Sequence, residues 1–364
     1  MGRDRPGGER SSARQRGVGR RIGARNRPTR RAWRADTRYS RCCPSSRFLA
    51  TRRIGGIQRP GSRPWQDLRP TGARQSGRNF GSGRAPRRPS RLGYPVSFWI
   101  ARARGIAVIV VFDVGNSEIT IGIFEGAELT AHWRLTTAAP RTADELALLI
   151  RSIVGADVAT PGGAEGSAIC SVVPAITPML AEACETSFGA KPIMIDAHAK
   201  LPIKLDVEEP FTVGADRIAN TLAASRIHKR DAIVVDMGTA TTYDCITGDG
   251  TFLGGVIQPG IMISADTLFR RTAQLPATDI VPPKRVISRR TDECIRAGVL
   301  YGAVDSIDGI VRRIKKEWPG KAKPLVIATG GMAETIRPHS AELELVDSFL
   351  TLKGIRLGYE LLTR

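Results

Sequence analysis

Two short segments of the chain each begin with an aspartate at the end of an apolar run and continue into a turn with glycine and hydroxyl side chains. They are Asp113-Val-Gly-Asn-Ser-Glu-Ile-Thr120 and Asp236-Met-Gly-Thr-Ala-Thr-Thr-Tyr-Asp244. A glycine in such a turn lets the backbone approach a phosphate closely because no Cβ intervenes. An aspartate at a strand end can hold a hydrated Mg²⁺. Either segment alone is also typical of a polar hairpin turn, but the pair predicts two phosphate-binding loops that face each other across a nucleotide cleft.

A third segment, Gly214-Ala-Asp-Arg-Ile-Ala-Asn220, places a carboxylate and a guanidinium at the expected start of a helix. The N-terminus of a helix favours anions. Arg217 can bind a carboxylate through two parallel hydrogen bonds, and Asp216 can accept a proton from a hydroxyl group. The same pattern is typical of a capped helix whose surface charges are only solvated, so the segment by itself leaves both interpretations open.

A pair of glycines, Gly330 and Gly331, follows an apolar strand and precedes a helix. Such a pair can let an adenine and a ribose lie on bare backbone, and it is equally typical of a tight turn into a helix. The chain has no G-x-x-x-x-G-K-[ST] segment. A nucleotide site here would therefore not be of the P-loop type.

The elements that must position these residues form a weak internal repeat. The β-branched run after Ile106 predicts a buried strand, and two further strands complete a meander over 106–112, 118–124 and 128–134. Thr142 and Glu145 have the spacing of a capping box, which predicts the start of a helix. After one more strand and helix the same order begins again at Asp231. The pattern β-β-β-α-β-α therefore occurs twice.

This repeat predicts an α/β protein of two duplicated halves. We expect each half to be a mixed five-stranded sheet flanked by helices, with an ATP cleft between the halves. The predicted boundaries are an extension over residues 1–105, an N-terminal half over 106–228 and a C-terminal half over 229–364.

The positive charge of the chain is confined to the extension. Residues 1–105 hold 28 arginines, no lysine and four acidic side chains, which gives +24, whereas the remaining residues hold 27 basic and 31 acidic side chains, which gives −4. A segment rich in Arg, Gly, Pro and Ser cannot bury enough apolar surface to offset its chain entropy, so we expect disorder. Three hypotheses remain: a polyanion-binding arm, a targeting peptide, or an upstream extension with translation starting near Ile106 to Val111. The exclusive use of arginine favours the last.

The remainder of the chain is slightly acidic, so we expect no nucleic-acid binding by the folded part. No stretch of 18 apolar residues occurs, and the chain does not open with a charged and then apolar signal. The sequence therefore predicts a cytoplasmic protein without a membrane partner.

With these segments in this order, the chain resembles the type III pantothenate kinases from about residue 109 to its C-terminus. The resemblance rests on D-V-G-N-S-x-x-T, V-G-A-D-R-x-A-N, V-D-x-G-T-A-T-T-x-D, L-G-G-x-I-x-P-G and the G-x-x-Y-G segment Gly298–Gly302. It implies a ribonuclease H-like fold of the actin and sugar-kinase type. It also implies ATP-dependent phosphorylation of the primary hydroxyl of pantothenate to 4′-phosphopantothenate, the first step of coenzyme A biosynthesis.

The resemblance further implies roles for individual residues. Asp216 matches the general base, and Asp236 matches a position that binds a monovalent cation, K⁺ or NH₄⁺, in addition to the Mg²⁺ that accompanies ATP. The pantothenate-contacting positions match Gly214, Ala215, Asp216, Arg217 and Thr291. The ATP-binding positions match Asp113, Val114, Gly115, Asn116, Ser117, Glu118, Ile119, Thr120 and Thr239. The family is dimeric, so we expect a homodimer with the substrate pocket near the subunit interface.

The departures from the family pattern are small. Ser117 replaces the commoner threonine and keeps the hydroxyl group, and the segment Leu205–Glu209 has no aromatic residue where many members have one. A kinase acting on a sugar or acetate, and a non-catalytic accessory protein of the same fold, are alternative hypotheses. An accessory protein should lack the base, yet Asp113, Asp216 and Asp236 are all present.

Overall fold

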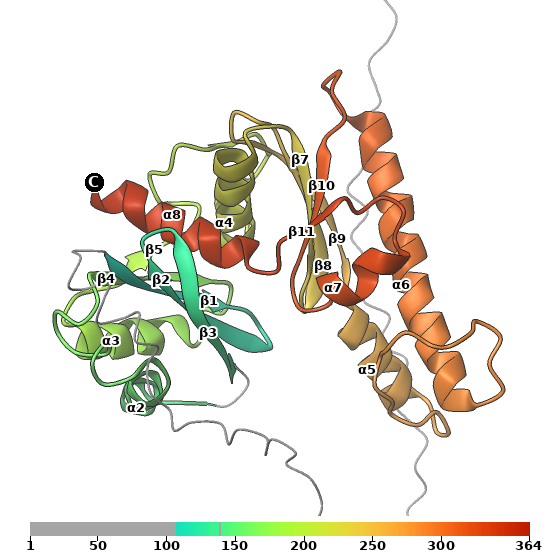
Figure 1. Ribbon diagram of the computed structural model, residues 1–364, viewed down its shortest axis with the longest axis horizontal. Coiled ribbons are helices and arrows are strands. Elements are labelled where there is room, and N and C mark those ends of the chain that lie inside the picture. Colours follow the sequence, from blue (N-terminus) through green and yellow to red (C-terminus); the bar gives the residue numbers. More distant parts are fainter. Residues whose placement is uncertain (1–106, 138–139) are drawn as a thin grey trace, which may run out of the picture. The chain divides into compact units, whose positions relative to one another are not determined.

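A computed structural model describes residues 107–137 and 140–364 (Figure 1). The Arg-rich extension, with its expected disorder and its three hypotheses, lies outside the described residues. The predicted strand after Ile106 is present and begins at Val108.

The first sheet has the strand order β3-β2-β1-β4-β5. Its first three strands form an antiparallel meander, and the last two run parallel to β1. This mixed sheet of five strands confirms the prediction for the first half. The strands are β1 (Val108–Val114), β2 (Glu118–Glu125), β3 (Glu128–Thr136), β4 (Gly166–Ser171) and β5 (Ile193–Met194).

Two helices, α2 (Ala143–Val154) and α3 (Thr177–Phe188), cover one face of the first sheet (Figure 1). Their apolar side chains share a buried core with those of β1 and β2. The capping box at the start of α2 is confirmed. The backbone N–H of Glu145 donates to the Thr142 hydroxyl at 3.2 Å, and the Thr142 N–H donates to the Glu145 carboxylate at 2.8 Å.

The second sheet repeats the meander and has the order β11-β10-β7-β8-β9-β6. It has six strands, so the prediction of five is wrong for this half. The extra strand is β6, which comes from the predicted N-terminal half and pairs in parallel with the edge of β9. Unpaired edge groups of β9 gain backbone partners in this way. The strands are β6 (Lys204–Leu205), β7 (Ala232–Met237), β8 (Ala240–Ile246), β9 (Thr251–Pro259), β10 (Leu325–Thr329) and β11 (Leu345–Val346).

Helices α5 (Ile261–Arg271), α6 (Thr291–Glu317) and α7 (Ala333–Ile336) pack on one face of the second sheet. Leu300 and Ile307 of α6 are fully buried there against β7 and β8. Over the described residues no helix, α6 included, is both long enough and apolar enough to cross a bilayer.

A pair of helices lies between the two sheets (Figure 1). They are α4 (Ala215–Ala223), which continues as one π-helical turn over Ala224–His228, and α8 (Leu350–Thr363). Both contribute to the core beneath the first sheet and to the core of the second. By chain order α8 belongs to the second half, but it packs on β1 and β4 of the first. The segment that carries Asp216 and Arg217 is therefore held between both sheets.

Candidate active site

The first predicted phosphate loop is the hairpin turn between β1 and β2. The turn is closed by a hydrogen bond of 3.0 Å from the Gly115 N–H to the Glu118 carbonyl. Thr137, at the end of β3, donates its hydroxyl to the Gly115 carbonyl at 2.7 Å. Asn116 and Ser117 are exposed at the tip. Hydrogen bonds to its backbone thus fix the turn and leave its polar side chains at the surface.

The second predicted loop lies between β7 and β8 and has the same construction. Asp236 is the last residue but one of β7, as Asp113 is of β1. The Gly238 N–H donates to the Ala240 carbonyl at 3.0 Å and closes the turn. The two loops touch, because the hydroxyl oxygens of Ser117 and Thr239 are 2.9 Å apart. The structure therefore brings the two predicted loops together.

The paired glycines follow β10, beside the second loop. Thr329, at the end of β10, stands opposite Asp236 in the parallel pairing of β10 with β7. Gly330 has φ of +87°, and a Cβ at that residue would lie 2.7 Å from Oδ1 of Asp236. A side chain larger than hydrogen is therefore excluded where the turn meets the aspartate.

Asp216 and Arg217 lie in the first turn of α4, as the sequence predicts. Asp216 Oδ1 accepts the backbone N–H of Arg217 at 2.8 Å. Burial raises the pKa of Asp216, while the N–H and the charge of Arg217 oppose that rise. A carboxylate with a raised pKa is a better proton acceptor than an ordinary surface aspartate.

Arg217 makes contacts that the sequence did not predict. Its Nε donates to Oδ1 of Asp244 at 2.6 Å, in an ion pair whose side chains are 14% and 0% exposed. Its guanidinium carbon stands 4.9 Å from the centre of the Phe252 ring. One edge and one face of the guanidinium are thus occupied within the protein.

Asn220, one turn further along α4, connects this ion pair to the second loop. Its amide nitrogen is 3.2 Å from Oδ2 of Asp236 and 3.5 Å from Oδ2 of Asp244. Its amide oxygen accepts the hydroxyl of Thr351 in α8 at 2.9 Å. Asn220 is fully buried, so these bonds fix its position between the two aspartates.

Four carboxyl groups gather where the loops and α4 meet. Burial raises the pKa of Asp113 to about 8 and that of Asp236 to about 7, and the charge of Asp216 adds to both shifts. Burial also raises the pKa of Asp244 to about 6, against the opposing charge of Arg217. Only one guanidinium, that of Arg217, faces these four carboxyl groups, so a bound cation would favour their ionised forms.

Within the described ranges, no three His, Cys, Asp or Glu side chains converge closely enough to hold a metal ion by themselves. This is consistent with the chemistry of Mg²⁺, which proteins often hold through one or two carboxylates together with substrate phosphates. Asp113 and Asp236 each stand beside a phosphate-type loop and can act in that way.

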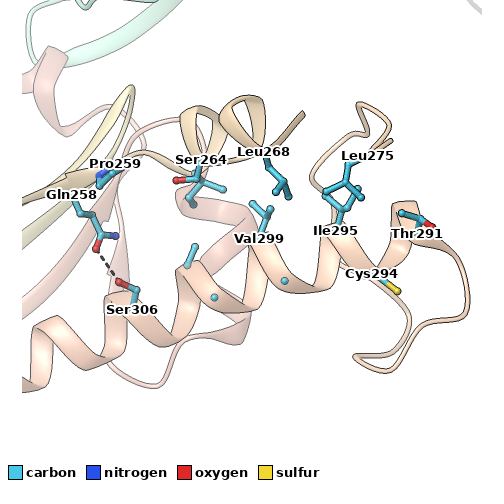
Figure 2. Close-up of a pocket in the computed structure, with 14 residues that line it drawn as sticks. Gln258, Pro259, Ser264, Leu268, Leu275, Thr291, Cys294, Ile295, Val299 and Ser306 are labelled. Atoms are coloured by element: carbon cyan, nitrogen blue, oxygen red, sulfur yellow. Dashed lines mark hydrogen bonds between the residues drawn. The ribbon is translucent and has the colours of Figure 1, made fainter. Parts of the chain in front are cut away.

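The fold does not bring the predicted site residue Thr291 to this cluster. It is the exposed first residue of α6, whose starting end lies away from α4 (Figure 1). It borders a cavity of about 660 Å³ between α5, α6 and the end of β9. Figure 2 shows Thr291 and Cys294 at one end of this cavity and the hydrogen-bonded Gln258 and Ser306 at the other.

The sequence did not reveal the roles of Asn220, Asp244 and Phe252. The first two stand within segments already singled out, at the ends of the runs that begin with Gly214 and Asp236. The available signal was that polar residues stand at positions expected to be buried, where each needs a hydrogen-bond partner. Which partners they have depends on the packing of α4 against the second sheet.

Comparison with known proteins identifies close relatives. Residues 109–313 match the family model described as type III pantothenate kinase. A type III pantothenate kinase from Bacillus cytotoxicus is 42% identical over 253 residues, which cover 70% of this chain and 96% of the relative. One from Moorella thermoacetica is 41% identical over 253 residues, which cover 70% of this chain and 99% of the relative.

Solved structures resemble the chain less closely. A ROK family glucokinase from Streptomyces griseus, in complex with glucose and AMPPNP, covers 71% of this chain and 99% of its own at 14% identity, with a TM-score of 0.40. This overlap is too loose to bear on the function.

Proposed function

Because the chain belongs to the type III pantothenate kinase family, we propose that it transfers the γ-phosphoryl group of ATP to the primary hydroxyl of pantothenate. The products are 4′-phosphopantothenate and ADP, in the first step of coenzyme A biosynthesis. The observation that carries the proposal is the contact of the two loops at Ser117 and Thr239, together with the carboxylate of Asp216, whose charge acts on the loop aspartates Asp113 and Asp236.

ATP binds between the two loops in this proposal. The backbone N–H groups and hydroxyls of the turns hold the phosphates, as neutral donors do in other phosphate sites. The Ser117 and Thr239 hydroxyls, which bond each other at 2.9 Å, turn toward phosphate oxygens when ATP enters. The residues assigned to ATP are Asp113, Val114, Gly115, Asn116, Ser117, Glu118, Ile119, Thr120 and Thr239.

Asp216 is the general base. An alcohol has a pKa far above 7, so a carboxylate that takes its proton as the new P–O bond forms lowers the barrier. Asp216 lies in the first turn of α4 with one oxygen held by the Arg217 N–H, which fixes the direction of the carboxylate. Phosphoryl transfer otherwise depends on positioning and on balancing the phosphate charge.

Arg217 holds the carboxylate of pantothenate. Because Asp216 and Arg217 are neighbours in one helical turn, a substrate anchored at Arg217 can present its hydroxyl to Asp216. Gly214 and Ala215 contribute backbone at the same helix start, where an anion is favoured.

Two kinds of cation complete the site. A divalent metal, Mg²⁺, accompanies the ATP phosphates next to Asp113, and a monovalent cation, K⁺ or NH₄⁺, binds at Asp236. Burial raises the pKa of both aspartates, and the charge of Asp216 adds to both shifts. A bound cation would stabilise their ionised forms, which supports this assignment. The cations supply charge neutralisation that a P-loop lysine supplies in other kinases.

We extend the proposal to a homodimer in which Thr291 completes the pantothenate site of the other subunit. The start of α6, which carries Thr291, lies away from α4 within one chain (Figure 1). The nearby α5 exposes apolar side chains, with Met262 51% and Ile263 43% exposed, and the loop before α6 exposes Ile287 at 86%. Apolar surface of this kind favours association with a second copy.

The experiment that tests the function is a phosphorylation assay with the full chain, pantothenate, ATP and Mg²⁺. K⁺, NH₄⁺ and Na⁺ are compared as the monovalent cation. We expect turnover that K⁺ or NH₄⁺ stimulates and Na⁺ does not. Turnover of a sugar or acetate in preference to pantothenate would contradict the proposal. No turnover by a folded chain with any of these acceptors would favour an accessory protein.

A further inference from the structure

The guanidinium of Arg217 is held on two sides by residues of the second sheet. Asp244 of β8 accepts its Nε–H at 2.6 Å and is fully buried. The ring of Phe252 in β9 lies against its face, 4.9 Å from the guanidinium carbon. Both contacts restrict the rotation of a side chain that otherwise has considerable rotamer freedom.

The buried Nη2 of Arg217 has no hydrogen-bond partner among the described residues. A buried donor without an acceptor costs free energy, and the cost is larger for a charged group. At Gly255 of β9, a Cβ would come within 2.7 Å of Nη2. Such a Cβ would first meet the carbonyl oxygen of Tyr243, at 1.7 Å, so only a glycine lets β9 pass this close to the guanidinium.

We propose that Asp244 is a positioning residue that orients Arg217 so that Nη2 is left to donate to the carboxylate of the substrate. This inference rests on the proposed function, since it names the group that sets the specificity of the same site for an acid. Asp244 acts through Arg217 and does not itself touch pantothenate.

Two donors reach Asp244, one at each oxygen. Arg217 Nε lies 2.6 Å from Oδ1, and Asn220 Nδ2 lies 3.5 Å from Oδ2. A carboxylate can accept both, whereas an asparagine has only one acceptor oxygen. The negative charge also offsets the buried charge of Arg217 before substrate arrives. An aspartate at residue 244 can therefore accept both hydrogen bonds and offset the charge of Arg217, whereas a neutral amide cannot do both.

The test compares pantothenate with panthenol, the neutral analogue that carries a CH₂OH group in place of the carboxylate. The full-length chain and its Asp244→Ala variant are assayed with both acceptors under the same conditions. For the variant we expect kcat/KM for pantothenate to fall roughly 10–100-fold, mainly through KM. For panthenol we expect little change, so the preference for the acid collapses.

A matched control is Asp308→Ala. Asp308 of α6 is a buried aspartate that accepts hydrogen bonds from Ser340 and from the backbone N–H groups of Ala341 and Glu342, at a place the proposal does not involve. We expect this variant to lower the melting temperature but to keep the preference for pantothenate over panthenol. Asp244→Asn is the second test variant in case Asp244→Ala does not fold.

Three outcomes overturn the inference. The first is an equal fall in kcat/KM for both acceptors in Asp244→Ala, because a purely structural role would have that effect. If only Asp244→Asn folds, the same outcome in that variant overturns the inference. Another is an unchanged preference in the variant. The third is equal use of both acceptors by the unmodified chain, since no carboxylate contact would then exist. Absence of turnover with either acceptor would instead contradict the proposed function itself.

Discussion

The hydroxyl oxygens of Ser117 and Thr239 lie 2.9 Å apart, although 122 positions separate the two residues in the chain. Each hydroxyl belongs to the turn that follows the first strand of a repeat. The contact therefore joins the corresponding turns of the two halves, at the place where the proposed function puts the phosphates of ATP.

Replacing Thr239 by alanine tests this placement. We expect the KM for ATP to rise roughly tenfold, because a hydrogen bond to a charged phosphate is lost. Thr239→Ser keeps the hydroxyl and should restore most of the affinity. Thr363→Ala, which removes an exposed hydroxyl near the end of α8, serves as the control in the same steady-state assay. An unchanged KM for ATP in Thr239→Ala would place the phosphates elsewhere.

The Asp216→Asn variant tests the general base. We expect kcat to fall about 10²–10⁴-fold while the KM for ATP stays near its original value, because proton transfer is impaired and nucleotide binding is not. Circular dichroism should show the same fold. Asp305→Asn, on an exposed position of α6, controls for loss of charge. A kcat near that of the unmodified chain would mean that another group accepts the proton.

The raised pKa of Asp113 predicts a dependence of stability on pH. Its value of about 8 in the folded chain exceeds the ordinary 3.8, so the folded state keeps a proton that the unfolded chain has released. The associated stability is complete below about pH 4 and is lost as the pH rises to about 8. Without nucleotide or metal, the melting temperature should therefore fall between pH 5 and 8.5.

The Asp113→Asn variant should show a smaller fall in melting temperature as the pH rises. At pH 8.5 we expect its melting temperature to exceed that of the unmodified chain by roughly 2–4 °C, the change that about 1 kcal/mol produces in a chain of this size. At pH 5 the melting temperatures of the variant and the unmodified chain should be similar. Differential scanning calorimetry measures both, with Asp305→Asn as the control. An equal pH dependence in both proteins would show that Asp113 is not protonated in the folded state.

The ion pair of Arg217 with Asp244 predicts a large effect of Arg217→Ala on stability. Removing the arginine leaves a fully buried carboxylate without a counter-charge, which typically costs about 3–5 kcal/mol. The loss of stability should be greater at pH 8 than at pH 5.5, since Asp244 becomes protonated at the lower pH and then carries no unpaired charge. Urea unfolding at both pH values measures this. The double variant Arg217→Ala with Asp244→Asn should recover stability at pH 8, and additive losses would contradict the pairing.

A mixing experiment tests the proposed contribution of Thr291 across subunits. Asp216→Asn and Thr291→Ala should each have low activity at limiting pantothenate. After subunit exchange, mixed dimers contain one site with both native residues, so activity should reappear. Ile263→Glu, which places a charge on the exposed face of α5, should yield monomers in sedimentation experiments. If mixing the Thr291→Ala and Asp216→Asn dimers restores no activity, Thr291 does not contribute to the partner's site.

Local patterns in the sequence determined much of the fold. The capping box of Thr142 and Glu145 and the two Asp-x-Gly turns depend on residues a few positions apart, so their structure can be predicted from spacing and turn chemistry. The repeat of strands and helices followed from hydrophobic periodicity. The same local signals placed Asp113, Asp236 and Asp216 at strand ends and at a helix start.

Only the tertiary structure decided what these residues meet. Asp244 pairs with Arg217 across 27 positions, and Asn220 bonds Thr351 across 131. Both contacts exist because α4 and α8 pack between the two sheets, an arrangement that no local pattern specifies. The sixth strand likewise depends on where the segment before α4 passes the free edge of β9. Sequence spacing thus determined which groups are present, and long-range packing decided which of them are paired, which stay charged and which remain free to bind.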